Sequence, residues 1–123
     1  MTTTREVGRR AEELAASWLE AKGYQIVAAN YRTRYGEVDL VCREGETICF
    51  VEVRSRSSPA YGSPAQSVDR AKRRRVVGAA TSWAMGHGGL DRLMRFDVVS
   101  VALGSPPRLE LFRGAFDAEG LGF

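Results

Sequence analysis

Apolar residues recur at helical spacing near the start of the chain. Their stripe is formed by Val7, Ala11, Leu14, Ala15, Trp18 and Leu19. Thr3 and Glu6 fit the Thr-x-x-Glu capping box, and Gly23 follows the last apolar position as a C-terminal cap. We therefore predict a first helix between Thr3 and Gly23. Glu12 lies at the edge of its apolar stripe, beside the small residue Gly8.

Downstream of this helix, apolar segments of strand length alternate with one further helical pattern. The expected strands cover 24–29, 37–43, 47–54, 93–103 and 109–112, the last being a strand or a helical turn. A second helix is expected to begin at Ser63, with Pro64 at its first position. This order predicts an α/β sandwich with a mixed central sheet, in which the chain crosses over through the second helix. We expect a single domain over residues 1–123, with a frayed tail at 117–123.

The second and third expected strands form a hairpin around Gly45-Glu46, which fits a two-residue turn with glycine first. This turn sets a register in which paired residue numbers sum to 91. Asp39 then lies opposite Glu52, and Cys42 opposite Cys49. Alternation places one wholly apolar set on a single face: Val38, Leu40, Cys42, Cys49, Val51 and Val53.

The other face of this hairpin carries the two carboxylates of Asp39 and Glu52. Opposed side chains lie about 4.5–5.5 Å apart at Cβ, so the two acids would repel each other unless a cation lay between them. Their oxygen ligands favour Mg²⁺ or Mn²⁺. The alternative is a pair of acids on a solvated sheet face. Asp97, by contrast, is expected to be structural and paired with Arg95 or Arg92, and His87 to be a loop residue.

The chain is mildly basic, with a formal net charge of +3. Its cationic residues cluster in one span: Arg54, Arg56, Arg70, Lys72, Arg73, Arg74 and Arg75. Clustered arginine favours contacts with phosphate, although a GC-rich genome also enriches arginine. The sequence has no apolar segment long enough for a membrane span and no signal peptide, so we expect a cytoplasmic protein with reduced thiols.

Several motifs together carry a family resemblance. They are Gly8-x-x-x-Glu12, GEVDLV at 36–41, FVEVRSR at 50–56, QSV at 66–68 with Lys72, and RFDVV at 95–99. In this combination the chain resembles the YraN family of predicted endonucleases, which is similar to archaeal Holliday junction resolvases. The resemblance implies the restriction-endonuclease-like α/β/α sandwich of the PD-(D/E)-x-K nuclease superfamily.

The resemblance also implies roles for individual residues. Asp39 matches the metal-binding aspartate, Glu52 matches the acid of the (D/E)-x-K element, and the Val53 carbonyl would be a backbone ligand. Glu12 matches the glutamate on the first helix of the resolvases. Arg54 stands where the superfamily has lysine.

The arginine at position 54 leaves three alternatives open. Arginine stabilises negative charge but does not act as a base, because its pKa exceeds about 12. Either the bound metal alone activates the attacking water, or Lys72 reaches the site from the second helix, or activity is weak or lost.

The leading hypothesis is a Mg²⁺- or Mn²⁺-dependent DNA endonuclease, with branched DNA of recombination or repair as a candidate substrate. The residues expected to contact nucleic acid are Arg56, Gln66, Arg70, Lys72, Arg73 and Arg74. Branched junctions are two-fold symmetric, so a homodimer is one expectation. The alternatives are a non-catalytic nucleic-acid-binding module on the same fold and a protein-interaction domain.

Overall fold

The computed structural model describes residues 3–56, 68–89 and 91–118. The helices and strands of this part are α1 (Thr4–Ala21), β1 (Gln25–Thr33), β2 (Gly36–Glu44), β3 (Thr47–Arg56), α2 (Arg70–Met85), β4 (Met94–Ala102) and β5 (Arg108–Phe116). The strands form one sheet in the order β1-β2-β3-β4-β5. β3 and β4 are parallel and are joined through α2, whereas the other neighbouring strands are antiparallel.

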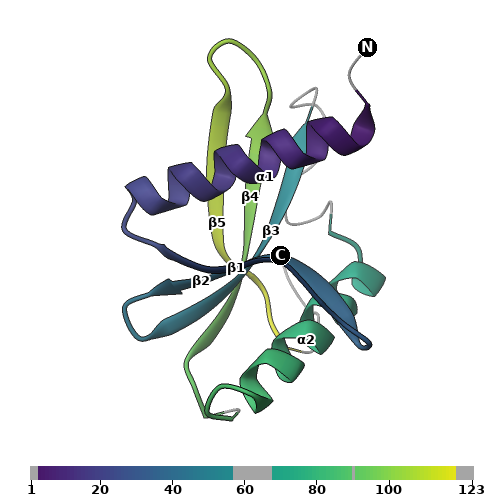
Figure 1. The fold of residues 1–123 in the computed structure, drawn as a ribbon, viewed down its shortest axis with the longest axis vertical. Helices are drawn as coiled ribbons and strands as arrows, with labels where there is room; N and C mark the ends of the chain where they lie inside the picture. The colour runs from purple at the N-terminus through teal and green to yellow at the C-terminus, as the bar shows by residue number, and fades with distance from the viewer. Residues whose placement is uncertain (1–2, 57–67, 90, 119–123) are drawn as a thin grey trace.

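The two helices cover opposite faces of the sheet (Figure 1). One apolar cluster lies beneath α2 and includes Phe50, Val76 and Trp83. The other lies beneath α1 and includes Leu19 and Val51. The predicted α/β sandwich with a mixed sheet and a crossover through the second helix is therefore confirmed.

The first helix begins and ends where its sequence signals predict. Thr3 Oγ1 accepts a hydrogen bond of 3.1 Å from the backbone N–H of Glu6, as in a capping box. Ala11 and Leu19 are buried against the sheet. Gly23 follows the helix with φ +96°, a conformation that glycine adopts without a steric cost.

The second helix begins later than the sequence analysis expected. Ser63 lies outside the described residues, but Val68 and Asp69 are not helical, and α2 begins at Arg70. The Asp69 side chain accepts a hydrogen bond of 2.8 Å from the N–H of Lys72. The expectation of one helix running from Ser63 through Lys72 is therefore wrong, because aspartate at this position provides the N-terminal cap.

The hairpin register is confirmed over the backbone-paired part of β2 and β3. Leu40 pairs with Val51 and Cys42 with Cys49, as the sum of 91 requires. Gly45 has φ +59° in the connecting turn, which favours glycine. Both cysteines are buried free thiols on the α1 side.

Two details of the sheet differ from expectation. β1 continues to Thr33 and β5 to Phe116, so both outer strands are longer than the apolar patterns indicated. Val38 packs in the cluster beneath α2 rather than with Leu40. This end of the β1–β2 hairpin lies on α2: a Cβ at Gly36 would overlap the carbonyl oxygen of Arg75.

No helix among the described residues is both long and apolar enough to cross a membrane.

Candidate active site

The carboxylates of Asp39 and Glu52 lie between β2 and β3, where the backbone pairing of the hairpin ends. The N–H of Asp39 donates to Glu52 Oε2 (3.0 Å), and the N–H of Val53 donates to Asp39 Oδ2 (2.8 Å). Each side chain thus satisfies a backbone group of the opposite strand, beyond the last backbone pair Leu40–Val51. The two acids are fixed in position by the sheet itself.

Glu52 is the most unusual side chain of this site. It is fully buried, and its Oε1 accepts no hydrogen bond from any described residue. Lys72 Nζ lies 3.1 Å from Oε1 and forms an ion pair with it. Burial raises the pKa of Glu52, the charge of Asp39 raises it further, and Lys72 partly offsets both, to give about 8. The pKa of Glu52 stays raised even beside Lys72, so the surroundings of this buried carboxylate favour a further cation.

Lys72 reaches Glu52 from the first turn of α2. The cap made by Asp69 fixes the backbone at this position, and the Lys72 side chain is 29% exposed. Burial lowers the pKa of Lys72, but its interactions with Glu52 and the charges of Asp39 and Glu37 together outweigh burial, so the net pKa is raised. Lys72 is therefore an ammonium at neutral pH. The second of the three alternatives left open by Arg54, a lysine arriving from helix two, is the one this geometry favours.

Glu12 joins the site from α1. Its side chain is half-buried, and its pKa is raised by burial and by the charge of Asp39. A hydrogen bond with Asn30 and the charges of Arg32 and Lys72 act in the opposite direction. Glu12 therefore interacts electrostatically with both Asp39 and Lys72, although they belong to different elements. Sequence reasoning missed Asn30, whose positive φ of 51° carries no clear signal in the sequence.

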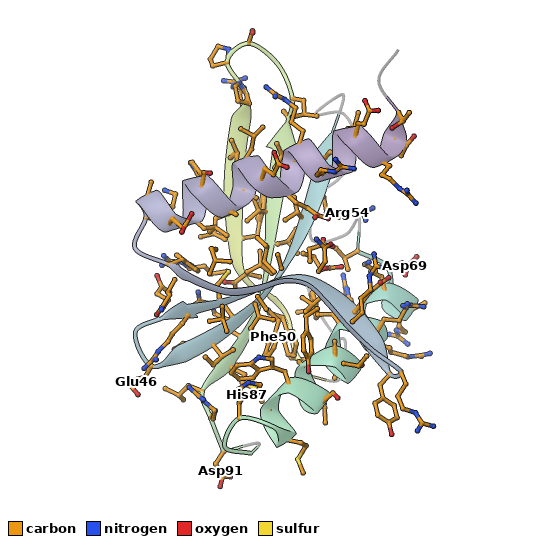
Figure 2. The ribbon with its side chains drawn as sticks, in the orientation of Figure 1. Glu46, Phe50, Arg54, Asp69, His87 and Asp91 are labelled. Atoms are coloured by element: carbon orange, nitrogen blue, oxygen red, sulfur yellow. The ribbon has the colours of Figure 1, made fainter. Side chains whose placement is uncertain are left out.

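The remaining residues that the sequence analysis assigned to catalysis or nucleic-acid binding differ in how exposed they are. Arg54 projects from β3, is half-buried and lies at the right of the view in Figure 2 with Asp69, away from Glu46, His87 and Asp91. Gln66 and the Arg56 side chain are outside the described residues. Arg70 and Arg74 are exposed on α2.

Arg73 has a packing role that the sequence did not suggest. Its Nε donates a 2.7 Å hydrogen bond to the Val68 carbonyl, and its guanidinium lies 5.6 Å from the Phe116 ring centroid. Glu37, which alternation places beside Asp39, is a salt-bridge partner of Arg75 at 3.2 Å and of Arg32 at 3.5 Å.

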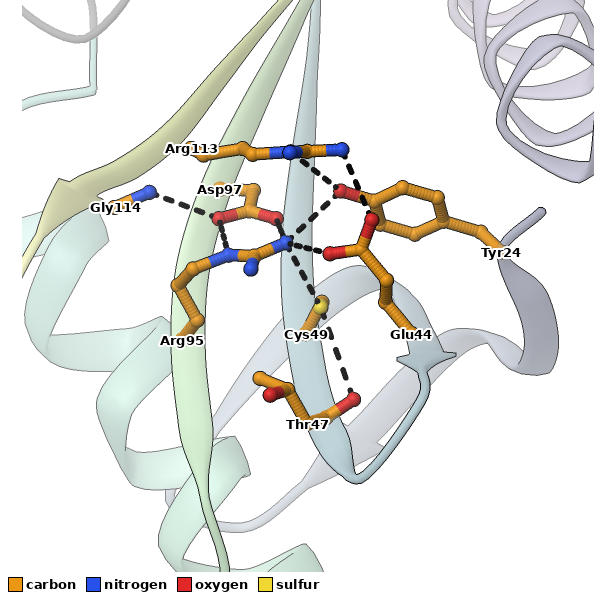
Figure 3. Close-up of polar contacts among 8 residues, drawn as sticks. All are labelled: Tyr24, Glu44, Thr47, Cys49, Arg95, Asp97, Arg113 and Gly114. Atoms are coloured by element: carbon orange, nitrogen blue, oxygen red, sulfur yellow. Dashed lines mark hydrogen bonds and ion pairs between the residues drawn. The ribbon is translucent and has the colours of Figure 1, made fainter. Parts of the chain in front are cut away.

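A second buried carboxylate, Asp97, lies on the α1 side of the sheet (Figure 3). Arg95 donates to both of its oxygens, at 2.8 and 2.9 Å, and the N–H of Gly114 donates to Oδ1 at 2.9 Å. Arg95 also contacts Tyr24 and Glu44. The predicted structural pairing of Asp97 with Arg95 is confirmed.

The donor atoms of this site are of the type that a hard cation prefers, but the described residues do not form a complete set of ligands. Within 3–56, 68–89 and 91–118, no three His, Cys, Asp or Glu side chains are gathered closely enough to hold an ion together. The donors that do lie together, Asp39 and Glu52, are carboxylate oxygens, which suit Mg²⁺ or Mn²⁺. The buried Oε1 of Glu52 accepts no hydrogen bond from the described residues and is only partly compensated by Lys72, so it is the oxygen most open to such a cation.

Comparison with known proteins assigns the family. The profile described as "Uncharacterised protein family UPF0102" matches residues 11–101. This chain belongs to UPF0102. The assignment confirms the resemblance to the YraN group that the sequence motifs indicated.

Members of UPF0102 match this chain over most of their length. A UPF0102 protein of Anaeromyxobacter dehalogenans (strain 2CP-C) is 57% identical over 115 residues, covering 93% of this chain and 86% of the relative. Another, from Myxococcus xanthus (strain DK1622), is 44% identical over 115 residues, covering 93% and 91%. The UPF0102 match at 11–101 spans the positions of Glu12, Asp39, Glu52 and Lys72.

Proposed function

We propose that this protein is a metal-dependent DNA endonuclease whose active site is built on Asp39, Glu52 and Lys72, with Glu12 beside them. The observation that carries the proposal is Glu52 Oε1, which is buried and accepts no hydrogen bond from the described residues. Burial makes this carboxylate costly to ionise, and the Lys72 ammonium, 3.1 Å from Oε1, offsets that cost only in part. A bound divalent cation would offset the remainder.

Asp39 and Glu52 would hold Mg²⁺ or Mn²⁺, and the Val53 carbonyl stays a predicted further ligand. When bound, such an ion lowers the pKa of a water molecule and neutralises charge on the phosphate. Glu12 adds negative charge close to Asp39. The residues of this chain thus supply oxygen donors and negative charge at one place, as a hard divalent cation requires.

The lysine of this site acts as a cation and not as a base. Because the Glu52 charge raises the pKa of Lys72, its ammonium group keeps its proton at neutral pH. Arg54 is also always protonated. Both side chains are therefore suited to stabilising negative charge that develops on the phosphate, and neither accepts the proton of the attacking water.

Flanking DNA would be held by charge and not by base recognition. Arg70 and Arg74 are exposed on α2, the helix that carries Lys72. Arginines placed in this way contact phosphates and position the duplex without reading its sequence. Branched DNA as the preferred substrate, and a homodimer that matches its symmetry, are further parts of the proposal.

The test is cleavage of linear and branched DNA with added Mg²⁺ or Mn²⁺. Wild type is expected to cleave at least one of these substrates, and Glu52→Gln and Asp39→Asn are expected to lose at least about 100-fold in rate, the size of effect seen for key electrostatic groups. Asp91→Asn, which changes an exposed carboxylate, is the matched control and should cleave like wild type. Equal cleavage by wild type and Glu52→Gln would refute the proposal.

A second candidate function is a non-catalytic nucleic-acid-binding module on the same fold. It is supported by the Lys72–Glu52 ion pair, which compensates the buried acid without a metal, and by the lack of three gathered ligands among the described residues. This candidate predicts salt-dependent DNA binding that survives Glu52→Gln and needs no divalent ion, together with no cleavage of any substrate.

A further inference from the structure

The turn between β1 and β2 presents an exposed aromatic side chain. Tyr35 is 63% exposed, although large apolar surfaces are usually buried. The guanidinium of the neighbouring Arg34 lies 5.3 Å from the Tyr35 ring centroid. The Tyr35 ring belongs to neither apolar cluster of the described residues. Its exposed face is therefore available to a ligand that has a flat apolar surface of its own.

The turn is held rigidly in place. Thr33 Oγ1 accepts a 3.1 Å hydrogen bond from the N–H of Tyr35 and donates one of 3.2 Å to the Gly36 carbonyl. The backbone also lies directly on α2, because a Cβ at Gly78 would overlap the Tyr35 carbonyl oxygen. The ring therefore projects from a fixed backbone, so a ligand that binds it need not order the turn.

The surroundings of Tyr35 are basic. Arg32 and Arg75 lie beside the turn and share Glu37 as an ion-pair partner, and Arg74 is exposed on α2. Aromatic rings interleaved with cations are the usual surface for unpaired nucleic acid, because bases stack on the rings while the cations contact the backbone.

A groove lies alongside the ring. It encloses about 410 Å³ and is lined by Tyr35, Gly78, Thr81, Ser82 and Met85. Gly78, Thr81, Ser82 and Met85 all belong to α2, and the Met85 side chain is 68% exposed, so the groove lies between the Tyr35 ring and the C-terminal half of this helix. This volume is at the lower end of the range for small-molecule sites, which suits a single flat ring system.

We propose that Tyr35 and this groove bind an unpaired DNA base, which stacks on the ring while Arg34 and Arg74 contact the adjoining phosphates. The proposal rests on the DNA-directed function proposed above and narrows its substrate to DNA with unpaired bases, as found at branches, flaps and bulges. No duplex base offers its face to a side chain without first leaving the stack.

The base-binding turn and the candidate active site are joined through one turn of helix. Arg75, whose carbonyl meets Gly36, is three residues after Lys72, a rise of about 4.5 Å along the helix. Glu37 links the two regions electrostatically, because it pairs with Arg75 and also acts on the pKa of Lys72. A strand that leaves the Tyr35 groove toward the N-terminus of α2 would therefore pass the helix turn that carries Lys72.

The experiment measures binding in EDTA, so that it does not depend on cleavage. Three DNAs of one sequence are compared: a single strand, a full duplex, and a duplex with one unpaired 2-aminopurine, whose fluorescence reports stacking. Wild type should bind the unpaired base and change its fluorescence. Tyr35→Ala should bind the single strand and the bulged duplex about 5- to 150-fold more weakly, with duplex affinity unchanged.

Two further variants separate stacking from other effects. Tyr35→Phe keeps the ring and should behave like wild type. Leu93→Ala removes an apolar side chain of similar exposure, 64%, away from the turn and should also behave like wild type.

The outcomes separate this inference from the endonuclease proposal. Unpaired-base binding that depends on Tyr35, without any cleavage, would support the groove and refute the endonuclease. If DNA is cleaved but Tyr35→Ala and wild type bind unpaired bases equally well, the endonuclease proposal is supported and the inference about the groove is refuted. A change in self-association of Tyr35→Ala in sedimentation, with unchanged DNA binding, would show a protein contact and overturn the inference.

Discussion

Glu52 on β3 and Asp97 on β4 are both fully buried carboxylates, and they lie one residue out of register on neighbouring parallel strands. They face opposite helices and have opposite surroundings. Asp97 accepts two hydrogen bonds from Arg95 and one from Gly114 (Figure 3). Glu52 accepts one from the N–H of Asp39, and its Oε1 pairs with the Lys72 ammonium at 3.1 Å but accepts no hydrogen bond from the described residues.

The difference separates a structural acid from a functional one. The hydrogen bonds of Asp97 compensate the loss of hydration, and they join β4 to the irregular part of β5 at Gly114, which has φ +60°. Glu52 is only partly compensated, and Asp39 adds repulsion. A buried acid that the fold leaves unsatisfied is a candidate site for a cation from outside the chain.

Removing Asp97 should produce the largest loss of stability. Asp97→Ala leaves the Arg95 guanidinium and the Gly114 N–H without their acceptor, so we expect the free energy of unfolding to fall by about 3 kcal/mol. Urea denaturation measures this loss, and Asp91→Ala, at an exposed position, is the matched control. A loss no larger than that of the control would remove the distinction between the two acids.

Replacing Glu52 should stabilise the metal-free protein, whereas replacing Asp97 destabilises it. Its folded pKa of about 8 lies above the ordinary glutamate value of 4.5, so the stability it contributes is fully present below about pH 4.5 and is lost as the pH rises through about 8. Glutamine does not ionise. Glu52→Gln should therefore raise the free energy of unfolding by about 1–3 kcal/mol at pH 9 and by much less at pH 5.

This gain is measured by urea denaturation in EDTA at both pH values. Asp91→Asn is the control and should show no pH-dependent difference from wild type. A loss of stability in Glu52→Gln at pH 9 would mean that the buried acid is as well satisfied as Asp97, which contradicts the comparison.

Lys72 should contribute most to stability when Glu52 is ionised, because Glu52 is its ion-pair partner at 3.1 Å. At pH 9, Lys72→Met leaves a buried carboxylate without its cation, and we expect a loss of about 1 kcal/mol in EDTA. At pH 5 Glu52 is protonated, so the loss should be close to zero. Arg70→Met removes a cation from the same helical turn and controls for the helix dipole. A pH-independent loss for Lys72→Met would show that the lysine acts through packing.

The sequence predicted those parts of the molecule that depend on local pattern. The capping box of α1, the hairpin register and the placement of both thiols follow from spacing and turn chemistry, and all are confirmed. Asp97 was predicted to pair with Arg95 or Arg92, and the partner is Arg95, which is two residues away on the same strand and therefore on the same face.

Long-range features were not predictable in this way. The start of α2 was placed too early, because Pro64 is a strong start signal and Asp69 a better cap. The distance of 3.1 Å between Lys72 Nζ and Glu52 Oε1 depends on the orientation of α2 relative to the sheet, which local sequence patterns do not specify. The sequence indicated which carboxylates lie together, but not that Glu52 Oε1 would be buried without a hydrogen bond.

Calorimetric titration of Mg²⁺ and Mn²⁺ into the protein tests the central claim most directly, because it needs no knowledge of the substrate. The variants are Glu52→Gln and Asp39→Asn, with Asp91→Asn as the control. We predict that wild type and the control bind the ion and that both site variants lose binding. No binding by wild type, or equal binding by Glu52→Gln, would contradict the account.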